Sequence, residues 1–285
     1  MMKTGIVSSY YLSRYGLTDG AKRMKQHGYT YADYQDFLNT ETEFFRLPEN
    51  EFEERLKDTK EKVNAEGIFY SQAHGAWRYP PRDLEIADRE ERFESMCKGI
   101  RGTAYLDCKN FVIHPIMPYG ANSDENPEET MQINYEFMGR LAEYGKQFGV
   151  TVCLENMPFP KHPITTVKHV VDFAKKINSD YFKVCIDTGH SLVCKENIAD
   201  GVRYAGKDLL AALHIHDNDG LQDRHLRPFE GILDFKGLSS ALHEIGFEGA
   251  FSLETSPKVT SDPVETEKNE LALAELALRL ADNKF

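Results

Sequence analysis

Short apolar runs alternate with longer polar segments from one end of the chain to the other. Each run is followed by a polar turn and then by a stretch with helical spacing that is rich in Glu, Lys and Arg. This repetition predicts successive strand and helix units. The expected strands cover residues 3–9, 31–37, 68–74, 110–116, 150–156, 182–188, 211–217 and 249–255.

The clearest of the expected helices lie at about 51–65 and about 128–146. The strand runs are continuously apolar and do not alternate, as expected when both faces of a parallel sheet are covered. With a spacing of roughly 30–40 residues per unit, we expect an α/β fold, a (β/α)8 TIM barrel, forming a single domain over residues 1–285. An open doubly wound sheet is the main alternative, but no GxGxxG turn follows the first strand and the sequence has no P-loop.

Charge and composition narrow the choice of partners. The formal net charge is −12 and the pI is about 5.4, so the surface on average repels nucleic acids and anionic membranes. No apolar run approaches the roughly 20 residues of a membrane span, and the N-terminus lacks the pattern of a signal peptide. We therefore expect a cytoplasmic protein.

The five cysteines include no CxxC pair, and Cys153 and Cys185 lie in apolar runs, which predicts reduced, buried thiols.

Residues of metal-ligand type end most of the expected strands, and in a barrel these ends face a common mouth. They are His74, His114, Glu155, Asp187, His216 and Glu254. One such residue is most often the polar start of a loop, but burying so many together is costly unless a cation pairs with them. We expect a divalent metal at Glu155, Asp187, His216 and Glu254. This oxygen-rich set suits Mn²⁺ or Mg²⁺, whereas inward-pointing histidines would make Zn²⁺ or more than one metal feasible.

Four motifs resemble those of the xylose isomerase-like TIM barrel superfamily: CLEN, CIDTGH, HIHDND with a following DRH, and SLET. That superfamily includes sugar isomerases and 3-epimerases, inosose dehydratases and enzymes of the endonuclease IV type. The resemblance covers nearly the whole chain and implies a metal site at the strand ends. It assigns Glu155, Asp187, His216 and Glu254 as metal ligands and His190 as a substrate-contacting or second-metal histidine. His74, His114, Asp223 and His225 match additional metal ligands of the endonuclease branch.

The leading hypothesis is a metal-dependent isomerase or epimerase of a sugar or sugar phosphate. We expect Glu155 and Glu254 to act as base and acid around an enediolate intermediate. Mn²⁺ is the first choice of metal, with Zn²⁺, Mg²⁺ or Co²⁺ as alternatives. The expected substrate-binding residues are His74, Trp77, His114, His190, Arg224, His225 and Arg227. Arg227 and Phe229 stand where relatives often have a PGEG-like turn, so we expect them to reshape the rim of the pocket.

Three other functions stay open at this point. An endonuclease IV-type phosphodiesterase would need a basic groove, which the acidic balance disfavours. A dehydratase acting on an inosose would share the proton-abstraction step and differ by expelling a hydroxyl. A sugar sensor that keeps its metal for stability alone is disfavoured by the presence of both glutamates. The expected partner is a small carbohydrate, with no nucleic acid and no membrane, and a homo-oligomer is an open option.

Overall fold

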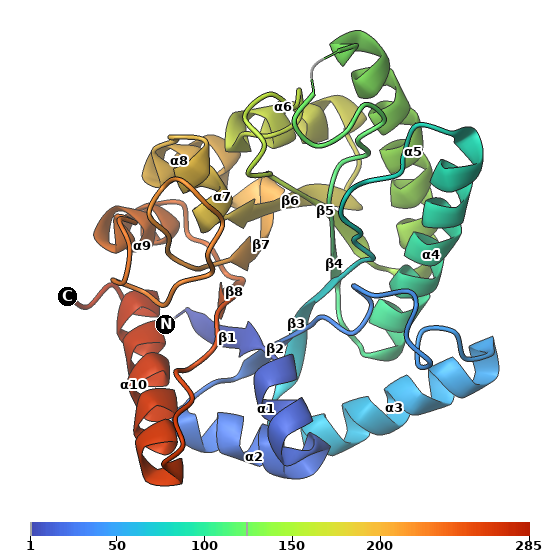
Figure 1. Ribbon diagram of the computed structural model, residues 1–285. Helices are drawn as coiled ribbons and strands as arrows, with labels where there is room; N and C mark the ends of the chain where they lie inside the picture. The colour runs from blue at the N-terminus through green and yellow to red at the C-terminus, as the bar shows by residue number, and fades with distance from the viewer. Residues whose placement is uncertain (1, 124) are drawn as a thin grey trace.

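Eight parallel strands form the centre of the molecule, and helices surround them as an outer ring (Figure 1). The structure is a computed structural model and describes residues 2–123 and 125–285. The strands are β1 (Lys3–Val7), β2 (Tyr31–Tyr34), β3 (Phe69–His74), β4 (Asn110–Ile113), β5 (Thr151–Glu155), β6 (Phe182–Asp187), β7 (Leu210–His214) and β8 (Ala250–Leu253). The expected (β/α)8 barrel is confirmed.

The helices mostly lie between successive strands. They are α1 (Ser9–Tyr15), α2 (Leu17–His27), α3 (Glu49–Ala65), α4 (Ile86–Tyr105), α5 (Pro127–Phe148), α6 (Val167–Ile177), α7 (Thr188–Val193), α8 (Ile198–Leu209), α9 (Phe235–Glu244) and α10 (Pro263–Ala281). Helix α5 begins where Asn126 accepts a hydrogen bond from the Glu129 backbone N–H, and it ends at Gly149 in the left-handed conformation. None of the helices in the described ranges is both long enough and apolar enough to cross a membrane.

The barrel closes beside its mouth. The strand order runs β7-β6-β5-β4-β3-β2-β1-β8, and all the ladders are parallel. Strands β7 and β8 are joined by a bridge between Ile215 and Leu253. There the Ile215 N–H donates to the Ser252 carbonyl, and the Glu254 N–H donates to the Ile215 carbonyl, both at 2.9 Å. These bonds fix Glu254 just beyond the end of β8.

Several strands are shorter than the sequence predicts. The expected runs 31–37, 110–116 and 211–217 end at Tyr34, Ile113 and His214 in the structure. The apolar pattern continues past these points because loop residues such as Phe37 and Ile116 are buried as fully as strand residues. Hydrophobic runs therefore locate each strand but overestimate its carboxyl end.

The barrel interior is filled in layers, and its composition changes toward the mouth. Small side chains pack together in one layer: Val112, Cys153, Cys185 and Ala212. All five cysteines of the chain are free thiols. Nearer the carboxyl ends of the strands the interior becomes polar, with Asp33, Gln72 and His214 almost completely buried. This polar layer forms the floor on which the candidate site rests.

Candidate active site

The carboxyl ends of the strands open into a cavity of about 730 Å³. Loops that follow β3 and β5 contribute its apolar and aromatic wall, which includes Trp77 and Phe159. Loops that follow β7 and β8 contribute the opposite wall, which includes Arg227 and Lys258. A cavity of this size lies within the roughly 300–1,000 Å³ of ordinary small-molecule sites. It is at the end of the barrel where TIM-barrel active sites occur.

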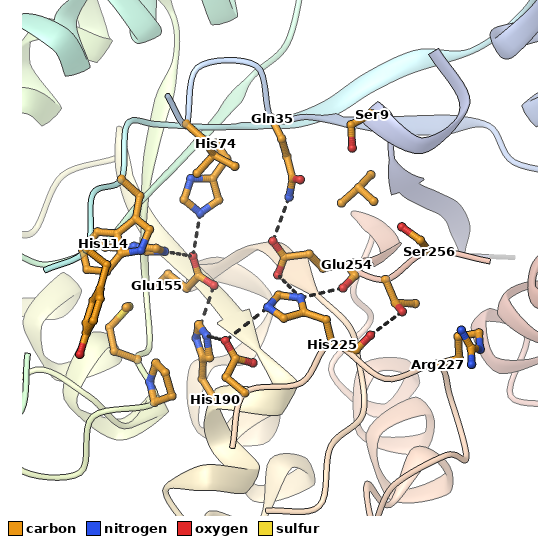
Figure 2. A pocket seen from close by; sticks show the side chains of 18 of the residues that line it. Ser9, Gln35, His74, His114, Glu155, His190, His225, Arg227, Glu254 and Ser256 are labelled. Carbon is orange, nitrogen blue, oxygen red and sulfur yellow. Dashed lines mark hydrogen bonds and ion pairs between the residues drawn. The ribbon is translucent and has the colours of Figure 1, made fainter. Parts of the chain in front are cut away.

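Glu155, at the end of β5, lies at the centre of the site and is surrounded by imidazoles (Figure 2). Its Oε2 atom lies 3.1 Å from His114 Nε2 and 3.4 Å from His74 Nε2. Its Oε1 atom lies 2.9 Å from His214 Nδ1 and 3.6 Å from His190 Nδ1. Burial alone would raise the pKa of the Glu155 carboxyl, but His214 and His114 outweigh that effect and hold the pKa well below its usual value.

Four side chains from different strand ends converge beside this carboxylate. Glu155, Asp187, His214 and Glu254 each offer one ligand atom, and these atoms all lie within 4.8 Å of one another. Gln35 donates a hydrogen bond of 2.9 Å to Glu254 Oε1 and so orients that carboxylate. Burial raises the pKa of Glu254, against the attraction of His214 and His225. Three carboxylates and one imidazole in a buried site form a donor set that a divalent cation would neutralise.

A second group lies next to the first. His216, Asp223 and His225 also offer ligand atoms that all lie within 4.8 Å of one another. Asp223 Oδ2 is 3.2 Å from His190 Nε2 and 3.3 Å from His225 Nε2. His216 Nε2 is 3.0 Å from Asp187 Oδ2, and the His216 ring stacks on that of His225 at 4.0 Å between centroids. His216 and Asp187 therefore connect the two groups.

The histidine of the four-residue group is His214, whereas the pattern of the sequence predicts His216. Strand β7 ends at His214, and His216 follows two residues later, beyond the end of the strand. Alternate residues of a strand point to the same face, so both histidines face the barrel axis at different heights. In the segment LHIHD the two histidines alternate with apolar residues. This alternation marks both His214 and His216 as facing the barrel axis, and so makes His214 a candidate ligand as well.

The other expected histidines are brought together, but the expected arginines are not. His74, His114, His190 and His225 all line the cavity. Trp77 also lines it, and its ring meets that of His114 edge-on at 4.5 Å. The expected histidines and the tryptophan therefore line the same cavity as the carboxylates of Glu155 and Glu254.

The loop after β7 agrees with the expectation in part. Arg227 lies at the edge of the cavity, where its guanidinium is 2.7 Å from Glu230 and remote from the central carboxylates (Figure 2). Arg224 is half exposed, pairs with Asp219 at 3.3 Å and is not among the residues that line the cavity. Phe229 does not line the cavity either, and its ring packs against Phe235 at 4.9 Å. Arg227 thus lies at the rim, whereas Arg224 and Phe229 make local contacts away from the residues that line the cavity.

Comparison with known proteins agrees with this architecture. The profile of the family described as xylose isomerase-like TIM barrel matches residues 21–279. An uncharacterised protein of Methanocaldococcus jannaschii is 26% identical over 263 residues, which are 89% of this chain and 83% of that protein. The D-psicose 3-epimerase of Enterocloster bolteae is 35% identical over 91 residues, which are 32% of this chain and 28% of the epimerase.

A solved structure extends the likeness to the whole chain. The crystal structure of a D-psicose 3-epimerase in the presence of D-fructose superimposes with a TM-score of 0.77, covering 98% of this chain and 99% of that chain. The sequence identity in this comparison is 18%, so the likeness concerns the fold. Ketose 3-epimerases are thus found both among the sequence relatives and among the structural neighbours.

Proposed function

Because the chain belongs to the xylose isomerase-like TIM barrel family, we propose that it is a divalent-metal-dependent isomerase or epimerase of a small carbohydrate. The observation that carries the proposal is the convergence of Glu155 and Glu254, which line the cavity, with the buried Asp187 and His214, all four offering ligand atoms within 4.8 Å of one another. A purely structural cation needs ligands, but it does not need them at the floor of an open pocket. The relatives that are epimerases support the same class of reaction.

The donor set fits a divalent cation. Glu155, Asp187 and His214 are at most 1% exposed, so their charges are poorly solvated and call for a counter-charge. We propose that these three residues and Glu254 hold the metal. Mn²⁺ is the first choice because three of the four donors are carboxylates, and Zn²⁺, Mg²⁺ and Co²⁺ are the alternatives. When bound, the cation would stabilise negative charge on the oxygens of the substrate.

The protein's own side chains supply the proton transfers. One of the two glutamates, Glu155 on β5 or Glu254 beyond β8, removes the proton next to the substrate carbonyl, and the other returns one. Return to the opposite face of the same carbon gives an epimer, and transfer to the neighbouring carbon gives an isomer. Gln35 keeps Glu254 oriented by its hydrogen bond of 2.9 Å.

The cavity walls would hold the rest of the sugar. His114 Nδ1 has no hydrogen-bond partner among the described residues and suits a hydroxyl group, and the Trp77 ring suits the apolar face of a sugar. His190 also lines the cavity, with its ring nitrogens paired to the Asn156 carbonyl and to Asp223. The cavity of about 730 Å³ leaves room for a substituent beyond a single sugar ring, so both free sugars and sugar phosphates are candidates.

A second candidate function has its own supporting observation. His74, Glu155 and His214 form a third group of ligand atoms that lie within 4.8 Å of one another, in addition to the two groups above. Several metals held side by side would suit phosphodiester hydrolysis. The net charge of −12 and the pairing of Arg224 and Arg227 with acidic neighbours disfavour binding of a polyanion.

One preparation can test both candidates. The protein is stripped of metal, reconstituted with Mn²⁺ and assayed against ketoses, ketose phosphates and inososes by ¹H NMR, with an abasic-site DNA duplex in parallel. Formation of an epimer or isomer supports the proposal. Loss of water from an inosose moves the assignment to a dehydratase. Cleavage of the duplex with no sugar turnover contradicts the proposal and favours the hydrolytic candidate.

A further inference from the structure

A buried carboxylate lies directly behind His214, on the side away from the cavity. Asp33 belongs to β2 and is fully buried, as is His214 on β7. Asp33 Oδ2 is 3.1 Å from His214 Nε2 and 3.0 Å from the side-chain nitrogen of Gln72 on β3. The contact therefore crosses the interior of the barrel and joins strands that are not neighbours in the sheet.

The backbone of Leu213 fixes which atoms carry hydrogens in this network. The Gln72 Nε2 group donates to the Leu213 carbonyl at 3.0 Å, and Gln72 Oε1 accepts from the Leu213 N–H at 3.4 Å. A carbonyl oxygen only accepts, so the Gln72 amide cannot be turned round. Its second N–H therefore points to Asp33, and Asp33 Oδ2 acts as an acceptor toward both Gln72 and His214.

An acceptor at this place requires a hydrogen on His214 Nε2. In a neutral imidazole the other nitrogen, Nδ1, then carries the lone pair. That nitrogen points toward two carboxylates that line the cavity, 2.9 Å from Glu155 Oε1 and 3.5 Å from Glu254 Oε2. Acceptors gathered in this way repel one another unless a proton or a cation lies among them.

We propose that Asp33 is a positioning residue, which holds the hydrogen on His214 Nε2 and thereby presents Nδ1 to a divalent cation at Glu155, Asp187 and Glu254. This inference rests on the proposed function, because it concerns the same metal. Among the described residues, Asp33 Oδ1 is buried without a hydrogen-bond partner. An unpartnered buried carboxylate oxygen costs stability. The cost is explained if the other oxygen is needed to set the tautomer of a ligand, as carboxylates do behind metal-binding histidines elsewhere.

The test uses Mn²⁺ alone as the probe, titrated calorimetrically into the metal-free full chain. Asp33→Asn keeps the size of the side chain and removes its charge, and we expect Mn²⁺ to bind about 10–100-fold more weakly. Asp83→Asn is the matched control. Asp83 is also buried and also has an unpartnered Oδ1, but its Oδ2 pairs with Arg92 at 2.7 Å. We expect its Mn²⁺ affinity to stay near that of the wild-type protein.

A double-mutant cycle separates positioning from general damage. If Asp33 acts through His214, Asp33→Asn adds no further loss of Mn²⁺ affinity in a protein that already carries His214→Ala. Additive losses in the cycle, or equal losses in Asp33→Asn and Asp83→Asn, overturn the inference and leave the proposed function standing. Failure of the wild-type protein to bind Mn²⁺ or Zn²⁺ overturns the proposed metal and the inference together.

A measurement on the wild-type protein tests the inference even if a variant does not fold. In protein labelled with ¹⁵N histidine and loaded with Zn²⁺, we expect the His214 resonances to show a hydrogen on Nε2 and metal on Nδ1. The opposite assignment, with the metal on Nε2, overturns the inference whatever the variants do.

Discussion

Glu155 Oε1 lies 2.9 Å from His214 Nδ1, although the two residues are 59 positions apart in the chain. The contact joins the ends of β5 and β7 across β6, whose own last residue is Asp187. Three neighbouring parallel strands thus deliver a glutamate, an aspartate and a histidine to one point, and Glu254 arrives from β8. The closed barrel produces this convergence because every strand ends at the same mouth.

The two histidines of the HIH sequence are expected to differ in metal binding. His214→Ala removes a member of the four-residue group, and we expect Mn²⁺ affinity to fall by more than the roughly 10–100-fold that the loss of an outer hydrogen-bonding partner costs. His216→Ala leaves that group intact and should weaken Mn²⁺ binding far less. Calorimetric titration of both variants checks the difference, and a larger loss in His216→Ala would restore the assignment made from the sequence.

Proton transfer is expected to depend on Glu254. Glu254→Gln keeps the size of the side chain and removes its ability to accept a proton, so kcat should fall by about 10²–10⁴-fold. Assays at saturating Mn²⁺ separate this effect from weaker metal binding. Glu244→Gln is the control, because Glu244 lies on the surface in an ion pair with Arg203. Full activity of Glu254→Gln would rule the residue out as acid or base.

Metal uptake at the second group should release protons. His225 belongs to this group, and burial alone would lower its pKa, but Asp223 and Glu254 raise it to about 10. The His225 imidazole is therefore protonated in the metal-free protein at neutral pH, and a cation at this group must displace that proton. We expect Zn²⁺ affinity at this group to rise with pH between 6 and 9. Calorimetry in buffers of different ionisation enthalpy measures the protons released, and a pH-independent affinity would contradict the expectation.

The C-terminal helix α10 is expected to make stability depend on acid pH. Burial alone would raise the pKa of Glu270, but hydrogen bonds from Tyr10, Tyr15 and Arg23 outweigh it and lower the pKa below 4.5. A depressed pKa contributes stability above the unfolded value, and that stability is lost as the pH falls through the folded pKa. Glu270→Gln removes the charged partner of Arg23 and should lower the free energy of unfolding by about 1–3 kcal/mol at pH 7. The difference from wild type should shrink below pH 4.5.

Glu267→Gln is the matched control on the same helix. Glu267 also faces Arg23, at 3.7 Å, but its side chain is 52% exposed. A solvated pair of this kind is worth about 1 kcal/mol or less. Urea unfolding of both variants at several pH values makes the comparison, and equal losses at pH 7 would show that burial of Glu270 does not matter.

The fold could be predicted because strand position depends on local pattern. Continuous apolar runs mark strands that are covered on both faces, and the eight runs in this chain correspond to the eight strands of the barrel. Exact strand ends depend on which backbone groups still pair across the sheet, and Phe37 and Ile116 disguise those ends because loop residues at the mouth are also buried.

Part of the candidate site could also be predicted, because the local apolar pattern locates the strands whose ends carry its residues. Glu155 and Asp187 end their strands both in the apolar pattern and in the structure, so the sequence places them correctly. His214 was missed because the apolar run continues through Ile215 after the strand has ended. Asp33 was missed because it lies within a short strand, and only closure of the barrel brings it opposite His214.

The most direct test of the account is incorporation of deuterium into a substrate carbon. Metal-free protein, Mn²⁺-reconstituted protein and the His214→Ala variant are incubated in D₂O with a ketose from the panel, and the carbons next to the carbonyl are followed by NMR. We expect exchange and product formation only in the reconstituted wild-type protein. Equal exchange without metal, or unchanged exchange in His214→Ala at limiting Mn²⁺, would contradict a metal-dependent proton transfer at this site.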